Sequence, residues 1–358
     1  MSKFKPFKVQ TSENFFRIKT IKISPRYFQK NYFCEMNTEQ HFIKMDELSQ
    51  NKVPFFFMID FLVDNIEIFT ESEIDKSGLL IDFQNFKSFE LQHADSEKLV
   101  LKSFPETQEN YQKGFDSVQK NLKLGNSYLI NYTRKTKIET NFNLEELFHI
   151  SEAKYKVLYP EKFVFFSPET FVEIRENQIF THPMKGTIDA DLENAAEILK
   201  NDVKEKAEHY TVVDLLRNDL SMVADNVRLD EFQRIDFIKT KQKNLFAMSS
   251  EISGFLKPEF QGKIGSIMKK LLPAGSILGA PKPKTLEIIL ESEKYERGFY
   301  TGICGWFDGE NLDSCVMIRF IEKENGELFF KSGGGITHLS KLEDEYQEMK
   351  NKIYVPVH

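Results

Sequence analysis

The sequence has 358 residues, of which 41% are apolar and 29% charged, which fits a folded protein with a sizeable core and excludes a disordered or collagen-like chain. Its 48 Lys and Arg residues against 55 Asp and Glu residues give a net charge of −7, so nucleic acid and anionic membrane surfaces are poor matches as partners. Three widely spaced cysteines, Cys34, Cys304 and Cys315, exclude a disulfide framework and favour a reducing cytoplasm. The N-terminus lacks the features of a signal peptide, and no apolar run approaches the roughly 20 residues that cross a bilayer.

Phenylalanine is unusually frequent, at 34 residues, and much of it lies in short β-prone runs. Such runs predict strands that fill an aromatic core rather than a cofactor site. They are PFFFMIDFL (54–62), FVFFS (163–167), FVEI (171–174) and ELFFK (327–331).

Helical periodicity alternates with these strands. Residues 106–124 predict a helix that stops at Gly125, and residues 340–353 predict one that starts at a Ser340 cap with Glu343 completing a capping box. Residues 262–272 and 281–293 predict two more. Residues 192–220 predict a long helical or helix-turn-helix region whose buried face contains Leu192, Ala195, Ala196, Leu199, Val203 and Tyr210.

Strand pairs followed by single helices favour an α+β fold of layered, mostly antiparallel sheets over a Rossmann array. Because no low-complexity linker or Pro/Gly/Ser tract divides the chain, we expect residues 1–358 to form one domain.

A block of three glycines, Gly333 to Gly335, follows the strand predicted at 327–331. Without side chains the backbone can approach a ligand and offer N–H groups to an anion. The alternative is a flexible turn, although a turn needs fewer glycines. The block matches neither a dinucleotide fingerprint nor a Walker loop, so a nucleotide is not implied.

The last predicted helix carries Glu345 and Glu348 near the edge of its apolar stripe. Carboxylates at i and i+3 can share a hard cation such as Mg²⁺. On spacing alone, a solvated acidic flank is the competing interpretation.

Lys185 lies in the segment THPMKGT (181–187), which closes a predicted strand, and Glu169 lies one predicted hairpin earlier. A lysine at a strand end can reach a pocket as an amine nucleophile or as a charge for an anion. Taken alone, both residues are more typical of the protein surface. Cys304 lies within a β-prone run and is predicted to be a buried strand residue rather than a nucleophile, and the histidine spacing does not indicate zinc.

Nine segments in order resemble the chorismate-utilising enzymes, and among them component I of the aminodeoxychorismate synthases. Together they cover about residues 107–353, with 1–106 as a shortened N-terminal part of the same fold. They are GNSYLINYT (125–133), SPETF (167–171), HPMKGT (182–187), EKAEHYTVVDLLRNDLSMV (205–223), PAGSILGAPKPKTLEII (273–289), RGFYTGICGW (297–306), DSCVMIRF (313–320), GGGI (333–336) and EYQEMKNKI (345–353).

This resemblance implies a single α+β unit with a pocket between antiparallel sheets. It implies that Mg²⁺ is held by Glu208, Glu345 and Glu348, although helical phase alone places Glu208 away from the predicted apolar face. It also implies substrate contacts from Gly186, Thr187, Tyr300, Ile318, Arg319, Gly333 and Lys352.

Lys185 points to one subfamily. Anthranilate synthases carry alanine at the matching position, whereas aminodeoxychorismate synthases carry lysine. In that subfamily the amine adds to C2 of chorismate as the C4 hydroxyl leaves, and ammonia then enters at C4 and expels the lysine. The resemblance gives Glu169 the role of general acid for the leaving hydroxyl.

Several positions depart from the family pattern. Ala247 stands where most members have histidine, Leu278 replaces a threonine, and His209 replaces an asparagine. The loss of the histidine argues mildly against a pyruvate-eliminating reaction. Because the segment before residue 107 lacks a recognisable tryptophan-pocket motif, we expect no tryptophan feedback.

The resemblance therefore implies an enzyme that makes 4-amino-4-deoxychorismate from chorismate, using Mg²⁺, on the route to p-aminobenzoate and folate. The expected partner is a glutamine amidotransferase subunit that supplies ammonia. An anthranilate or isochorismate/salicylate synthase is the first alternative. The second is a non-catalytic chorismate-binding subunit, which the Ala247 and Leu278 departures allow.

Overall fold

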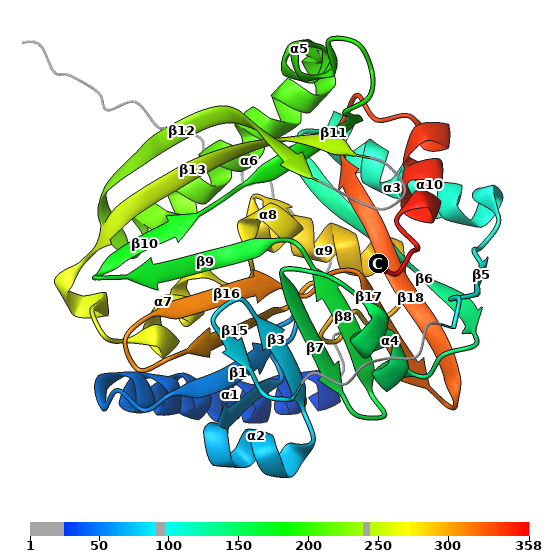
Figure 1. The fold of residues 1–358 in the computed structure, drawn as a ribbon. Helices are drawn as coiled ribbons and strands as arrows, with labels where there is room; N and C mark the ends of the chain where they lie inside the picture. The colour runs from blue at the N-terminus through cyan, green and yellow to red at the C-terminus, as the bar shows by residue number, and fades with distance from the viewer. Residues whose placement is uncertain (1–24, 91–96, 239–243, 358) are drawn as a thin grey trace, which may run out of the picture.

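The computed structural model describes residues 25–90, 97–238 and 244–357, and within them the chain forms two nine-stranded antiparallel sheets with flanking helices (Figure 1). This architecture is the predicted α+β class. No described helix combines the length and the apolar character that crossing a membrane requires.

The first sheet takes strands from the N-terminal, middle and C-terminal parts of the chain. Its order is β11-β13-β10-β9-β16-β15-β1-β2, with β12 along β13. Its strands are β1 (Phe55–Ile59), β2 (Ile66–Thr70), β9 (Thr170–Arg175), β10 (Gln178–Thr181), β11 (Met184–Asp189), β12 (Ala224–Ile238), β13 (Leu245–Leu256), β15 (Ile303–Phe307) and β16 (Leu312–Val316).

The second sheet is assembled from the segments between those strands. Its order is β14-β6-β18-β17-β8-β7-β3-β4, with β5 along β6. Its strands are β3 (Leu80–Phe83), β4 (Phe86–Lys87), β5 (Leu101–Phe104), β6 (Leu129–Thr140), β7 (Tyr155–Tyr159), β8 (Phe163–Ser167), β14 (Gly279–Ala280), β17 (Phe320–Glu324) and β18 (Glu327–Ile336).

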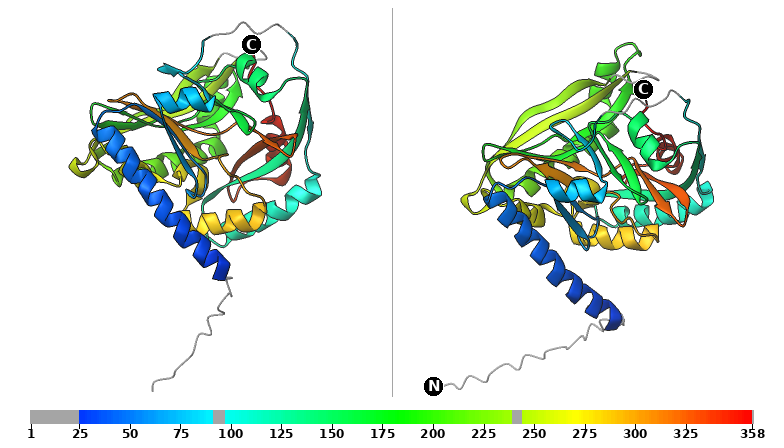
Figure 2. Two further views of the ribbon diagram at one scale, coloured as in Figure 1. Left: turned by 90° about the horizontal axis from the view of Figure 1, so that it is seen from below. Right: turned by 60° about the horizontal axis from the view of Figure 1, so that its bottom comes forward.

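Helices cover these sheets and fill the space between their edges (Figures 1 and 2). Among them α6 packs on β12 and β13, α3 packs on α9, and α4 covers β7 and β8. They are α1 (Pro25–Gln50), α2 (Glu71–Ser77), α3 (Gln108–Lys123), α4 (Leu144–Ile150), α5 (Ala195–Asn201), α6 (Val203–Ser221), α7 (Ile264–Leu271), α8 (Gly275–Leu278), α9 (Lys282–Glu293) and α10 (Leu342–Asn351), with a 3₁₀ turn at Pro258–Phe260.

The phenylalanine-rich strands fill the core, as predicted. All five residues of β1 and all five of β8 are buried. Rings from both sheets meet there: Phe56 of β1 lies edge-on to Phe83 of β3 at 6.0 Å between centroids. Cys304 is likewise buried in its strand, opposite Cys315 of β16.

Two predictions about helix ends and faces were wrong. The region 192–220 is divided into α5 and α6 at Asp202, whose side chain caps α6 by accepting a hydrogen bond from the N–H of Glu205 at 2.8 Å. The break changes the helical phase, so Val203 and Tyr210 are 78% and 54% exposed, and Leu192 lies exposed before α5. The last helix starts at Leu342, and its N-cap residue is Lys341, whose side chain makes no capping hydrogen bond. The capping box predicted at Ser340 therefore does not form.

A buried ion pair ties the end of α9 to the second sheet. Arg297 contacts Glu293 at 2.6 Å, and both side chains are almost fully buried. Glu293 also accepts from the N–H of Thr133 at 2.7 Å, and Arg297 donates to the carbonyl of Asn131 at 2.6 Å. The pair therefore fixes β6 against the segment that follows α9.

We predict that Glu293→Gln lowers the free energy of unfolding by about 3–5 kcal/mol, because it leaves the buried Arg297 guanidinium without its carboxylate. Equilibrium urea denaturation measures this. Glu287→Gln, which breaks the exposed Lys284–Glu287 pair, is the matched control and should cost about 0.5 kcal/mol or less. Equal small losses in the two variants would contradict the assigned role of the buried pair.

Candidate active site

A cavity of about 790 Å³, part of it open to solvent, lies where the two sheets meet. Its wall takes residues from β6, β11, α8, β18 and two of the places where the chain passes between the sheets, β8 to β9 and β16 to β17. The sequence-predicted residues that line it are Glu169, Lys185, Tyr300, Ile318, Arg319, Gly333 and Lys352.

The two sheet-to-sheet crossings place Glu169 and Arg319. The first joins β8 to β9 through Ser167–Pro168–Glu169, and the second joins β16 to β17 through residues 317–319. The crossings are hydrogen-bonded to each other's strands: the N–H of Val316 donates to the Glu169 carbonyl at 3.1 Å, and the N–H of Phe166 donates to the Arg319 carbonyl at 3.2 Å. Arg319 has a φ of 53°, an uncommon left-handed conformation for a side chain of this size.

Cationic side chains predominate around the cavity. Lys185 reaches from β11 across to the other sheet, where its Nζ lies 4.0 Å from the point that a Cβ on Gly335 would occupy. Burial lowers the pKa of Arg319 to about 10, which still leaves it charged at neutral pH. Lys352 donates to the carbonyl of Gly333 at 2.8 Å. A cavity lined by these groups is suited to an anionic ligand.

Glu169 is the acidic side chain among the residues that line the cavity. Desolvation by the surrounding protein raises its pKa, and the positive charges of Lys185 and Lys352 only partly oppose this effect. A carboxyl group with a raised pKa keeps its proton to a higher pH than an ordinary glutamate and can donate it, as a general acid must.

The glycine block forms part of β18 rather than a loose turn. Gly334 lies beneath α10: a Cβ at this position would sit 3.0 Å from Oε1 of Glu348 and 3.4 Å from Oε2 of Glu345. Glycine here therefore lets the helix and its carboxylates approach the strand closely.

These two glutamates fit the chemistry of a magnesium site. Their oxygens converge on the same point above Gly334, and their negative charges add to burial in raising the pKa of Tyr111 nearby. Glu345 is buried, whereas Glu348 is partly exposed and contacts Lys352 at 2.8 Å. Oxygen ligands of this kind suit Mg²⁺.

Glu208 is not brought into the same cluster. It is buried on α6 and does not line the cavity, and among the described residues no three acidic, histidine or cysteine side chains lie close enough to hold one ion. The expectation that Glu208 completes the site therefore stays a prediction.

Among the described residues, Gly186 also lies outside the cavity wall, and the side chain of Thr187 is outside the described part of the structure. Gly186 has a φ of 72°, and a Cβ there would lie 2.8 Å from Oε2 of Glu205 on α6. Its glycine identity is explained by backbone conformation and helix packing. Thr187 follows in β11, opposite Ala247 of β13.

Sequence reasoning missed several wall residues. Asn131 of β6, Ser276 and Ile277 of α8, and Gly279 of β14 all line the cavity. Their segments, 125–133 and 273–289, had been noted as motifs, but only the paired sheets show which of their residues face inward. Gly279 has a φ of 104°, and a Cβ there would lie 1.8 Å from the carbonyl of Leu129.

Comparisons with known proteins show the family and the fold of this chain. The model of a family described as chorismate binding enzyme matches residues 38–358. An uncharacterized PabA-like protein of Pasteurella multocida is 49% identical over 87% of this chain and 97% of its own length. Aminodeoxychorismate synthase component 1 of Bacillus subtilis is 36% identical over 52% of this chain and 40% of its own length. The crystal structure of a 2,3-dihydroxybenzoate-specific isochorismate synthase assigned in Bacillus anthracis shares the fold, with a TM-score of 0.66 at 22% identity over 89% of this chain and 87% of that one.

We predict that Gly334→Ala weakens Mg²⁺ binding about 10-fold or more, because the added methyl group displaces the Glu345 and Glu348 oxygens. Isothermal titration calorimetry with MgCl₂ alone measures the affinity. Gly335→Ala is the matched control, because its methyl group would meet Leu129 instead. Unchanged affinity in Gly334→Ala would show that the two carboxylates do not hold the ion.

A second prediction concerns pH. Since the folded-state pKa of Glu169 is raised, folding favours its protonated form, and this contribution to stability is lost as pH rises through that pKa. A glutamine at this position does not titrate, so Glu169→Gln has no such loss. The free energy of unfolding of the variant minus that of the unchanged protein should therefore increase from about pH 4 and level off above the folded-state pKa. Urea denaturation between pH 4 and 8 measures the difference. A difference that falls with rising pH would mean that the carboxylate form is the favoured one.

Proposed function

Because this chain belongs to the chorismate binding enzyme family, we propose that it replaces the C4 hydroxyl of chorismate with ammonia, giving 4-amino-4-deoxychorismate for p-aminobenzoate and folate synthesis. The observation that carries the proposal is the position of Lys185: its amine enters the same cavity as the Glu169 carboxyl. A nucleophile and an acid facing one cavity are what substitution of a poor leaving group requires.

Substrate binding follows from charge. Chorismate carries two carboxylates, and Arg319 and Lys352 supply cationic donors on the cavity wall. The Arg319 guanidinium can bind a carboxylate through two parallel hydrogen bonds, which orients the ring as well as attracting it. Tyr300 and Ile318 provide buried or partly buried surface beside these charges.

The reaction then needs two substitutions. In the first, the deprotonated Lys185 amine forms a bond to C2, the ring double bonds shift, and the C4 oxygen leaves as water with a proton from Glu169. In the second, ammonia forms a bond to C4, the electron pairs shift back, and the C2–nitrogen bond breaks to return the lysine. Chorismate and ammonia give the aminated product and water, with the enolpyruvyl group retained.

Magnesium would be held by Glu345 and Glu348, with Glu208 as the further ligand that the family pattern suggests. When bound, the ion supplies positive charge that anchors a substrate carboxylate and withdraws electron density from the ring. The glycines of β18 keep room for this arrangement by letting α10 lie close to the strand.

Ammonia would come from a glutamine amidotransferase subunit that acts as partner. The aminodeoxychorismate synthase component 1 to which this chain is similar supports the amination assignment. Lys185 favours it over anthranilate synthesis, since the anthranilate enzymes resembled by these motifs carry alanine at this position.

We predict that purified protein with chorismate, MgCl₂ and ammonium chloride forms 4-amino-4-deoxychorismate, identified by mass spectrometry. Lys185→Ala should reduce the rate by about 1,000-fold or more, because the nucleophile is removed. Lys323→Ala, which breaks an ion pair at the surface, is the matched lysine control and should leave the rate within about twofold.

The product separates the candidates. Anthranilate or salicylate from the unchanged protein would contradict the proposed reaction. Binding of chorismate without turnover in any variant would favour a non-catalytic subunit.

A further inference from the structure

The strand that carries the Lys185 amine is paired irregularly with its neighbour β13. β10 and β11 lie end to end along the same edge of β13 and share one register: Thr181 of β10 is opposite Ile252, and Met184 of β11 is opposite Ser249. They are therefore two parts of one strand that is interrupted at His182 and Pro183.

The ladder is weakened on both sides of Lys185. Pro183 has no N–H to donate, although its carbonyl accepts from the N–H of Ser250 at 3.0 Å. Directly after Lys185 the register shifts, at Gly186 with its φ of 72°. Lys185 thus belongs to a short paired segment between a proline and a bulge. Because the backbone pairing is interrupted on both sides, side-chain contacts near the interruption contribute more to fixing its position.

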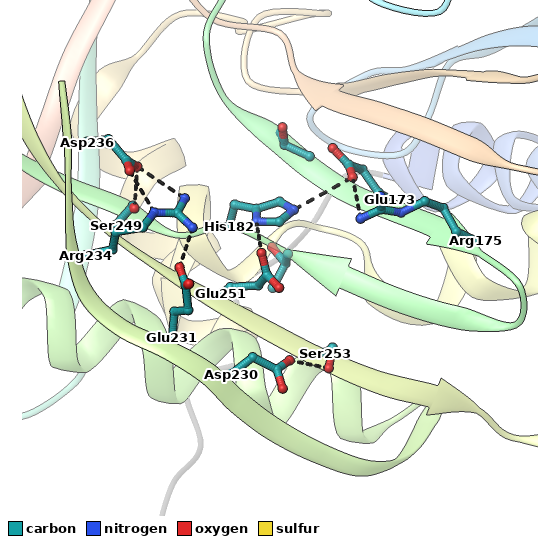
Figure 3. A network of polar contacts seen from close by, with 12 residues as sticks. Glu173, Arg175, His182, Asp230, Glu231, Arg234, Asp236, Ser249, Glu251 and Ser253 are labelled. Atoms are coloured by element: carbon teal, nitrogen blue, oxygen red, sulfur yellow. Dashed lines mark hydrogen bonds and ion pairs between the residues drawn. The ribbon is translucent and has the colours of Figure 1, made fainter. Parts of the chain in front are cut away.

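His182 occupies that interruption. Continuing the shared register places it opposite Glu251 of β13, and its Nδ1 lies 3.5 Å from Oε2 of Glu251. Its Nε2 lies 3.8 Å from Oε2 of Glu173, diagonally across on β9. Figure 3 shows the imidazole between the two carboxylates. One side chain therefore links β10 to both neighbouring strands.

Other charged groups surround the two carboxylates, but only His182 contacts both of them among the described residues. On β9, Arg175 contacts Glu173 at 3.4 Å, and Lys154 does so from the residue before β7 at 3.4 Å. On β12, Asp236 is engaged by Arg234 at 2.7 Å. The contact with His182 is the first of the causes that lower the pKa of Glu173 to about 2.

The two side chains point to opposite faces of the sheet. Successive residues of a strand alternate, so His182 shares the outer face with exposed Met184, whereas Lys185 enters the cavity. His182 therefore has no access to the substrate, and its influence on the amine passes through Pro183 and Met184.

We propose that His182 is a positioning residue for Lys185: by bridging Glu251 and Glu173 across three strands, it holds the β10–β11 junction so that the lysine amine points at its target. The catalytic part of this inference rests on the proposed function, whereas the positioning part concerns the lysine alone. The bridge requires a side chain with polar nitrogens on two sides, as an imidazole or a guanidinium has and the single nitrogen of an amide does not provide.

Three variants test the bridge. In His182→Gln one donor group faces two carboxylates that repel each other, so kcat should fall about 10- to 100-fold while KM stays within about twofold, because the amine is misplaced but the binding cations are not. His182→Arg again places separate nitrogen atoms toward the two carboxylates and should recover at least half of the loss on a logarithmic scale. Combining His182→Gln with Glu251→Gln removes the repulsion between the two carboxylates. The kcat of this double variant should therefore also exceed that of His182→Gln alone. Arg228→Gln, which breaks the exposed Arg228–Asp230 pair on the same sheet, is the matched control.

A second measurement does not depend on the reaction. Reductive methylation with formaldehyde and borohydride, followed by peptide mass spectrometry, should label Lys185 at least about threefold faster in His182→Gln than in the unchanged protein, relative to Lys352, because a released amine spends more time in solvent.

The outcomes separate the two claims. If Lys185 labelling rises in His182→Gln but no variant aminates chorismate, the positioning role holds and the proposed function fails. If the unchanged protein aminates chorismate and His182→Gln matches it in kcat and labelling, the positioning role is wrong. A loss in His182→Gln that neither the arginine nor the double variant relieves would also overturn it, since it would indicate general structural damage.

Discussion

The balance between desolvation of the Glu169 carboxyl and its electrostatic attraction to the Lys185 and Lys352 amines is the constraint on which the site depends. Desolvation favours the neutral acid, whereas the two amines favour the carboxylate, and desolvation prevails. The balance leaves a carboxyl group that can hold a proton among cationic side chains. In the proposed reaction, this combination would let one cavity bind an anion, attack it with an amine and protonate its leaving group.

The fold brings these charged groups to one cavity because the chain passes between the two sheets at adjacent points. Glu169 and Arg319 lie at these crossings, and each crossing is hydrogen-bonded to a strand that borders the other. Lys185 comes from the first sheet and reaches the glycines of β18 in the second. The site therefore requires both sheets, and the buried Glu293–Arg297 pair holds β6, which forms part of the cavity wall.

Local sequence pattern predicted the strands and several helices well. The burial of all five residues of β1 follows from a pattern within a few residues. So does the end of α3 just before Gly125, which has a φ of 73°. Helical phase failed in 192–220, because the break at Asp202 resets the phase and so exposes Val203 and Tyr210. Periodicity carries no information across a cap whose presence depends on how the chain packs.

The site was less predictable from residues alone. Spacing indicated a cation site at Glu345 and Glu348 but not its distance from Gly334, which depends on how α10 packs on β18. Glu208 came only from family resemblance, and the described residues do not gather it with the other two. His182 gave no sequence signal, because its partners Glu173 and Glu251 are set by strand register.

The most direct test of the account is the mass of the Lys185 peptide after the protein is mixed with chorismate and MgCl₂ without ammonia. Attack at C2 would leave this peptide heavier by chorismate less one water, and added ammonium should release the adduct as aminated product. Formation of the product while the Lys185 peptide stays unmodified at every time, with or without ammonia, would contradict the central claim that this amine bonds to the ring.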